Sequence, residues 1–144
     1  MTDPTTVQRY LEAWQRRDPA AIVACFTADG TYSDPAGQGM QGEVLAGYAS
    51  ALFSAFPDFN IEALEHGFIG GDTYALQWVI TGTQNGDFMG LPPTGRAGRL
   101  EGMDLIKLEG NKIKSVTGYW DTKTLMDQLG VQLVPAAVGA TSTN

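Results

Sequence analysis

Apolar side chains recur with helical spacing near the start of the chain. Val7, Tyr10, Leu11 and Trp14 fall at positions i, i+3, i+4 and i+7, which places them on one face of a helix. Asp3-Pro4 precedes them, and an aspartate followed by a proline is typical of a helix start. The pattern therefore predicts a first amphipathic helix packed against a core.

Two further helices are predicted before Pro57. Asp18-Pro19 repeats the start signal, and a short second helix follows that ends before Gly30. A third amphipathic helix follows a glycine-rich turn. The apolar positions are Ile22, Val23, Cys25 and Phe26 in the second helix, and Val44, Leu45, Tyr48, Ala49, Leu52, Phe53 and Phe56 in the third. Between these helices, "TYSD" predicts a short strand with Tyr32 and Asp34 on the same face, because strand side chains alternate.

Strand patterns dominate the chain after Pro57. Residues 59–69 and 73–83 flank a glycine-rich turn, and residues 99–109 and 112–120 flank a Gly-Asn turn, so each pair predicts a hairpin. A short helix closes the pattern before Gly130.

Helices that come first and antiparallel strands that come later indicate the α+β class. We expect a curved, mostly antiparallel sheet that wraps around the N-terminal helices and leaves a conical cavity. Gly82, Gly102 and Gly118 interrupt the strand patterns and are candidates for the points of curvature. The chain reads as one domain over residues 1–130, with residues 131–144 as a C-terminal arm or flexible tail.

Composition narrows the classes of function. The net charge is −7 and the basic residues are scattered, which argues against nucleic acid as a partner. No apolar run reaches the roughly 20 residues of a membrane span, and the N-terminus does not resemble a signal peptide; a cytoplasmic location is the default expectation. Cys25 is the only cysteine and His66 the only histidine, so we expect no internal disulfide, no metal site and no cofactor.

Four stretches carry a resemblance to a known family: "FPDF" at 56–59, "TGTQNGDFMGLPPTGR" at 81–96, "GMDLIKLEGNKI" at 102–113 and "YWDTKTLMDQLG" at 119–130. With the helical start, they resemble the nuclear-transport-factor-2-like superfamily of cone-shaped α+β barrels. The resemblance is closest to the SnoaL-like polyketide cyclase and ester cyclase group. It implies a cavity that receives a small organic molecule, and a homodimer that pairs through the outer face of the sheet.

The resemblance also implies site residues. Relatives that catalyse aldol ring closure have an aspartate at the position that matches Asp121, where it acts as general acid and base. The family pattern often reads Gly-Thr-His where this chain has Gly82-Thr83-Gln84, and glutamine can only form hydrogen bonds. Relatives that hydrolyse epoxides need an Arg-x-Asp pair, and Trp78 and Ile80 stand at the matching positions.

Asp121 admits two interpretations. Aspartate is a favoured helix cap, and "TKTLMDQLG" behind it is a plausible helix. As a working carboxylate, it would be enclosed by Trp78, Tyr119 and other apolar groups. That enclosure would raise its pKa from about 3.9 toward neutrality, where transfer of a proton in both directions is efficient.

Asp34 and Gln84 complete the predicted catalytic set. Asp34 is either a turn residue before Pro35 or a second carboxylate in the cavity, where the two aspartates would raise each other's pKa. Gln84 shares strand parity with Trp78 and is either a donor to an enolate oxygen or an exposed strand end. Asp104 faces the inside or the outside of the sheet, because its strand has no clean apolar face.

The predicted walls of the cavity are mostly aromatic. The expected substrate-binding residues are Tyr32, Trp78, Trp14, Phe53, Met103 and Tyr119. The sequence thus predicts cofactor-independent acid–base catalysis on a small apolar carbonyl compound, most plausibly aldol-type ring closure. The alternatives are a module that binds a hydrophobic ligand without chemistry, or an enzyme like ketosteroid isomerase or epoxide hydrolase.

Overall fold

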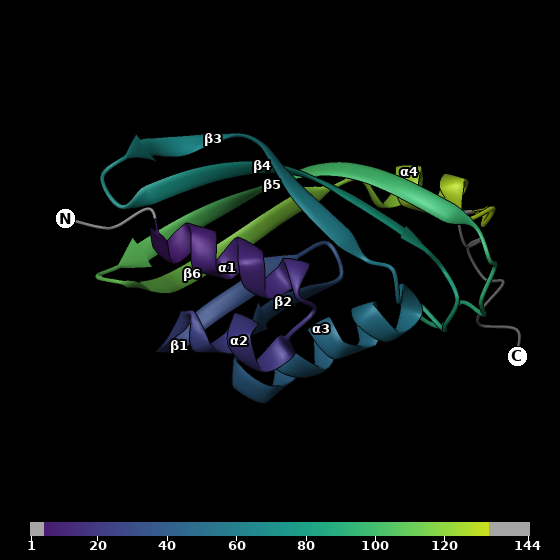
Figure 1. The fold of residues 1–144 in the computed structure, drawn as a ribbon, viewed down its shortest axis with the longest axis horizontal. Coiled ribbons are helices and arrows are strands. Elements are labelled where there is room, and N and C mark those ends of the chain that lie inside the picture. The colour runs from purple at the N-terminus through teal and green to yellow at the C-terminus, as the bar shows by residue number, and fades with distance from the viewer. Residues whose placement is uncertain (1–4, 133–144) are drawn as a thin grey trace, which may run out of the picture.

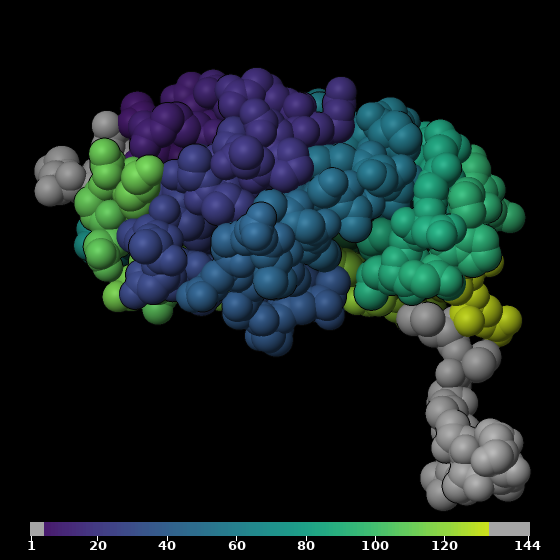
Figure 2. All heavy atoms as spheres, turned by 90° about the horizontal axis from the view of Figure 1, so that it is seen from below, coloured from purple at the N-terminus to yellow at the C-terminus, as the bar shows by residue number. Residues whose placement is uncertain are grey.

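The computed structural model describes residues 5–132, which form one layer of helices against a curved sheet (Figure 1). The elements are α1 (Thr5–Gln15), α2 (Pro19–Ala24), β1 (Phe26–Asp34), β2 (Gly37–Met40), α3 (Gly42–Ala55), β3 (Asn60–Gly70), β4 (Thr73–Thr83), β5 (Ala97–Glu109), β6 (Lys112–Trp120) and α4 (Thr122–Gln128). Helices α1 to α3 pack side by side over one face, and the segment after β4 lies beyond the C-terminal end of α3 (Figure 2). Residues 133–144, and with them most of the expected arm, lie outside the described part.

The six strands form one open sheet in the order β2-β1-β6-β5-β4-β3. Strands β3 to β6 pair antiparallel as a meander, and β1 pairs parallel with β6. The predicted α+β class and the curved, mostly antiparallel sheet around N-terminal helices are therefore confirmed, with a sheet that does not close on itself.

The region before α3 differs from the prediction. The second helix ends at Ala24, and Phe26 begins a nine-residue strand rather than extending the helix. The reason is long-range pairing: Phe26 lies opposite Ile113 of β6. The glycine-rich turn contains a strand of its own, β2, in which Met40 pairs with Tyr32.

Register across the meander decides which side chains face the helices. Trp78 on β4 lies opposite Gly102 on β5, and Asp104 on β5 lies opposite Gly118 on β6. A Cβ on Gly102 would lie 2.3 Å from the Trp78 ring, so this glycine leaves the space that the indole fills. These inward positions, together with Tyr10 on α1, bring polar groups into an otherwise apolar core.

None of the helices in the described part of the chain combines the length and the apolar character needed to span a membrane.

Candidate functional site

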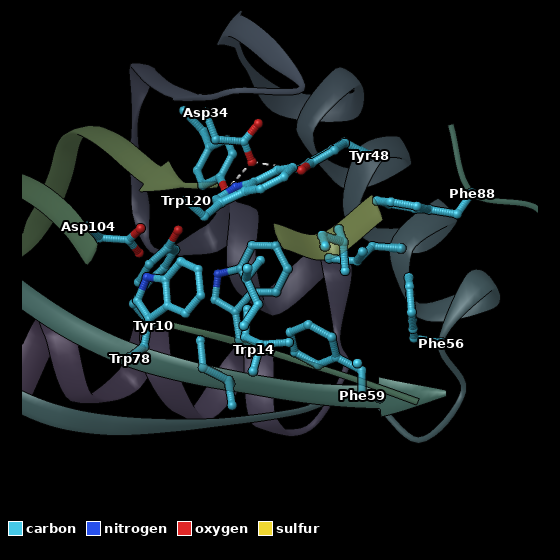
Figure 3. A pocket seen from close by; sticks show the side chains of 18 residues that line it. Tyr10, Trp14, Asp34, Tyr48, Phe56, Phe59, Trp78, Phe88, Asp104 and Trp120 are labelled. Atoms are coloured by element: carbon cyan, nitrogen blue, oxygen red, sulfur yellow. Dashed lines mark hydrogen bonds between the residues drawn. The ribbon is translucent and has the colours of Figure 1, made fainter. Parts of the chain in front are cut away.

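A partly enclosed pocket of about 80 Å³ lies between the helices and the concave face of the sheet (Figure 3). Half of its eighteen lining residues are aromatic, including all three tryptophans of the chain, Trp14, Trp78 and Trp120. Two aspartates, Asp34 and Asp104, are the only charged residues in the lining; within residues 5–132, no lysine, arginine or histidine reaches it. The pocket is therefore apolar in its walls and acidic at one end.

Asp34 is the hydrogen-bonded member of the two aspartates. The hydroxyl groups of Tyr32 and Tyr48 each donate to Oδ2 at 2.7 Å, and the backbone N–H of Ala36 donates to Oδ1 at 2.7 Å. The turn after β1 provides the amide donor, and α3 provides Tyr48 (Figure 3). Three donors therefore hold this carboxyl group in a fixed position.

Asp104 is the member without such donors. Its carboxyl group is buried, and neither the Tyr10 hydroxyl nor the Trp78 indole N–H beside it forms a hydrogen bond of normal geometry within residues 5–132. Burial raises the pKa of Asp104 to about 7, the charge of nearby Asp34 adds to the rise, and the Trp78 indole beside it partly opposes it. A carboxyl group with a pKa near neutrality can both accept and return a proton under ordinary conditions.

The two aspartates meet at Gly118. A Cβ on this glycine would lie 2.9 Å from Asp104 Oδ1 and 3.4 Å from Asp34 Cβ. The absence of a side chain at this position lets both carboxyl groups approach the same end of the pocket.

Two buried donors face the same region. The hydroxyl of Tyr10 and the indole N–H of Trp78 have no hydrogen-bond partner among the described residues. In Figure 3, both side chains lie beside Asp104. Burial and the charge of Asp104 raise the pKa of Tyr10 well above its usual value, so its hydroxyl keeps its proton.

Asp121 lies outside this pocket. Its side chain is exposed and caps α4: it accepts from the backbone N–H of Lys123 at 3.0 Å and from the Thr124 hydroxyl at 2.9 Å. These hydrogen bonds, that of Thr124 above all, lower the pKa of Asp121. The expectation that apolar enclosure raises its pKa is wrong, because Trp120 turns into the pocket and the next residue turns out.

Gln84 is buried but does not line the pocket. Its side-chain amide donates to the carbonyl groups of Gly86, Leu91 and Pro92 at 3.1–3.3 Å, and its oxygen accepts from the Thr94 hydroxyl at 2.8 Å. Both its amide nitrogen and its amide oxygen are thus engaged in holding the connection between β4 and β5. The predicted donor to an enolate is thus occupied elsewhere.

That connection nevertheless shapes the pocket. Phe88 lies in the loop that the Gln84 side chain holds, and it is buried. Its ring packs edge-to-face on Phe56, the residue that follows α3, with ring centroids 5.2 Å apart. Both rings line the end of the pocket opposite the aspartates (Figure 3).

The six expected substrate-binding residues fall into three groups. Tyr32, Trp78 and Trp14 line the pocket, whereas Phe53 packs behind the wall against Trp14. The remaining two, Met103 and Tyr119, pair with each other across β5 and β6 and are 43% and 60% exposed on the outer face. Their expected place in the cavity is wrong, because their neighbours Asp104 and Trp120 occupy the inward positions of the same strands.

No group of three or more histidine, cysteine, aspartate or glutamate side chains in residues 5–132 has a geometry suited to a metal ion. His66 contacts the Tyr74 hydroxyl at the sheet's edge, and Cys25 is buried.

Comparisons with known proteins identify the family of the chain. A family model described as SnoaL-like polyketide cyclase matches residues 5–129. A structure from Jannaschia sp. CCS1, assigned as a SnoaL-like polyketide cyclase, superposes with a TM-score of 0.79 at 21% identity, over 90% of this chain and 92% of that one. No curated protein matches the chain.

Two further solved structures share the fold. IdmH of Streptomyces antibioticus, assigned as a polyketide cyclase, has a TM-score of 0.75 at 24% identity, over 88% of this chain and 97% of that one. A protein of Catenulispora acidiphila with a ketosteroid isomerase-like fold, in complex with trimethylamine, has a TM-score of 0.78 at 23% identity, over 92% and 98%. The match of the family model over most of the chain shows that this protein belongs to the SnoaL-like polyketide cyclase family.

Proposed function

We propose that the protein catalyses a cyclase-type proton transfer on a small, largely apolar carbonyl compound, with Asp104 as general base and acid. The observation that carries the proposal is the buried carboxyl group of Asp104 in an aromatic pocket, where burial raises its pKa to about 7. Family membership supports a cyclase-type role.

In this mechanism, the Asp104 carboxylate removes a proton from a carbon next to a carbonyl group. The electron pair of the broken C–H bond moves into an enolate. The enolate carbon then attacks a second carbonyl carbon of the same molecule, which forms the new C–C bond and leaves an alkoxide. Asp104 returns its proton to that alkoxide, so the net reaction is ring closure without loss or gain of atoms.

Asp34 assists without taking the proton itself. Its carboxylate already accepts three hydrogen bonds, from Tyr32, Tyr48 and the Ala36 amide, so its oxygens are engaged within the fold. Its charge nevertheless raises the pKa of Asp104. Two carboxyl groups in different environments thus take different roles, a pattern known from enzymes that use one carboxyl group as an acid and another as a charged neighbour.

Double-bond isomerisation is the nearest second candidate. It begins with the same proton removal and differs only in returning the proton to a carbon instead of an alkoxide. The ketosteroid isomerase-like fold of the Catenulispora protein is in keeping with it. Epoxide hydrolysis is disfavoured by the apolar Trp78 and Ile80 in the lining.

Deuterium exchange tests the shared first step. The probe is 2-tetralone, a flat neutral ketone whose protons between ring and carbonyl exchange slowly in heavy water. We expect wild-type protein to accelerate the exchange, and Asp104→Asn to lose at least about a hundredfold of that acceleration, because positioned bases contribute roughly 10²- to 10⁴-fold. The matched control is Asp121→Asn, the same change at an exposed cap, which should exchange like wild type. Full activity of Asp104→Asn would refute the proposal, and the lack of exchange by wild-type protein would favour a binding module.

A further inference from the structure

The pocket contains two donors that the fold leaves unused. The Tyr10 side chain is 1% exposed and the Trp78 side chain 3% exposed, and neither the hydroxyl nor the indole N–H has a partner in residues 5–132. Buried donors are almost always hydrogen-bonded, because leaving one without an acceptor is costly. The Asp104 carboxyl group lies beside both donors (Figure 3) but forms a hydrogen bond of normal geometry with neither, so both donors remain available to the acceptor of a ligand.

Three other polar groups of the pocket are already paired with one another. Tyr32 and Tyr48 both donate to Asp34. A ligand oxygen that accepts from both Tyr10 and Trp78 would lie close to Asp104, beside which both donors stand (Figure 3).

The charge of the lining restricts that ligand further. Asp34 and Asp104 are its charged residues, and no basic side chain of the described part lines the pocket. An anionic ligand would lose its hydration and meet carboxyl groups instead of cations, which is strongly unfavourable. Nine of the lining residues are aromatic, and such a lining suits a flat, largely apolar molecule.

We propose that Tyr10 and Trp78 together donate to one oxygen of an uncharged, flat ketone or enone, and that the pocket rejects carboxylated molecules of the same shape. This inference rests on the proposed function for what happens next, since the bound carbonyl oxygen becomes the enolate oxygen when Asp104 removes the neighbouring proton. Neutral donors aimed at developing negative charge are a general means of lowering such a barrier. The donors take the role that the sequence assigned to Gln84.

Tyr10→Phe isolates the contribution of the hydroxyl. The substitution removes only an oxygen that has no partner in the fold, so the free energy of unfolding should not fall. The matched control is Tyr119→Phe, which removes a hydroxyl from the exposed outer face. Trp78→Phe is less clean, because the indole fills the space left by Gly102.

Three probes of similar shape distinguish a ketone ligand from a hydrocarbon and from a carboxylate. Acetophenone carries the carbonyl oxygen, α-methylstyrene replaces that oxygen with a methylene group, and benzoate replaces the methyl group with a charged oxygen. The readout is the indole N–H resonance of Trp78 in a ¹H–¹⁵N NMR titration of the full chain, which needs no turnover.

The expected result is a downfield shift of the Trp78 N–H with acetophenone, no such shift with α-methylstyrene, and no binding of benzoate. Tyr10→Phe should weaken acetophenone about five- to tenfold, as expected for one hydrogen bond, and leave α-methylstyrene unchanged; Tyr119→Phe should change neither. Equal binding of the ketone and the hydrocarbon, binding of benzoate as tight as that of acetophenone, or binding of none of the probes would overturn the inference.

Failure of this inference is distinguishable from failure of the proposed function. Asp104→Asn retains both donors and should still bind acetophenone while it loses proton exchange. If that variant loses exchange but the Trp78 resonance never responds to the ketone, the base assignment stands and the donor assignment falls.

Discussion

Asp104 and Gly118 lie opposite each other on β5 and β6, and a Cβ on the glycine would stand 2.9 Å from Asp104 Oδ1. A contact that short forces the carboxyl group or the strand to move. We therefore predict that Gly118→Ala displaces Asp104 and lowers the exchange rate of the ketone about ten- to a hundredfold, as expected for a misplaced catalytic group. Overpacking should also destabilise the fold by about 1–3 kcal/mol.

Gly67→Ala is the matched control for that change. Gly67 lies in β3, and a Cβ there would meet nothing within 4 Å. The control should retain wild-type exchange; an unchanged rate in Gly118→Ala as well would show that the position of Asp104 does not matter to the chemistry.

The exposed cap Asp121 offers a second prediction. Asn caps a helix about as well as Asp, whereas Ala does not. Asp121→Asn should retain both melting temperature and proton exchange, and Asp121→Ala should lower the melting temperature measurably but retain exchange. These are measured by thermal unfolding and by the deuterium assay. Loss of exchange in Asp121→Asn with the fold intact would instead support the role that the family resemblance assigns to this residue.

Gln84 offers a third prediction, on the apolar end of the pocket. Gln84→Ala removes a donor from the carbonyl groups of Gly86, Leu91 and Pro92, of which Leu91 keeps the backbone N–H of Phe88. The loss should cost about 1–3 kcal/mol. The loop that holds Phe88 against Phe56 should then open more often, and its backbone amides should exchange hydrogen faster. Gln128→Ala, which removes the two hydrogen bonds between the Gln128 side chain and the Arg99 backbone near the start of β5, is the control and should leave the loop protected. Equal protection of the loop in both variants would contradict this role of Gln84.

Stability should depend on pH through Asp104. Its pKa is about 7 in the folded protein and about 3.9 in an unfolded chain, so the folded state binds more protons between these values. The contribution of Asp104 to the free energy of unfolding is fully present below about pH 4 and is lost as the pH rises through 7. In this window the free energy of unfolding falls by at most about 1.4 kcal/mol for each pH unit. The groups that face Asp104 are Asp34 and the pocket tyrosines, and those tyrosines stay neutral over this range.

The asparagine in Asp104→Asn cannot ionise, so the free energy of unfolding of this variant should rise relative to that of the wild type as the pH rises. Denaturant unfolding of both proteins across this range measures the difference, in which the other carboxyl groups largely cancel. A constant difference between the two proteins would mean that Asp104 titrates alike in the folded and unfolded states.

Local patterns in the sequence predicted much of the fold. The apolar face of α1, with Val7, Tyr10 and Trp14 buried, follows from helical spacing alone. The start of β1 does not, because Phe26 is strand only through its pairing with Ile113 of β6, a partner far away in the sequence. The homodimer implied by the resemblance stays a prediction.

The site was harder to predict for a related reason. Asp121 carries a strong local signal, and the structure places it as the cap of α4. Asp104 carries no such signal. Its neighbours Met103 and Leu105 are apolar and point to the opposite face of the strand, so the pattern of β5 does not reveal that the face with Asp104 is the inner one. Only the register with Gly118 and the packing of α1 bring its carboxyl group into the pocket.

The central claim is that Asp104 is the carboxyl group that exchanges its proton near neutral pH. The most direct test follows the ¹³C resonance of its side-chain carboxyl group by NMR from about pH 4 to about pH 9, with the resonance assigned by its loss in Asp104→Asn. Because Asp34 is close, the curve describes the pair, but the main step at Asp104 should have its midpoint near 7. A single transition near pH 4, the value of an ordinary aspartate, would contradict the account.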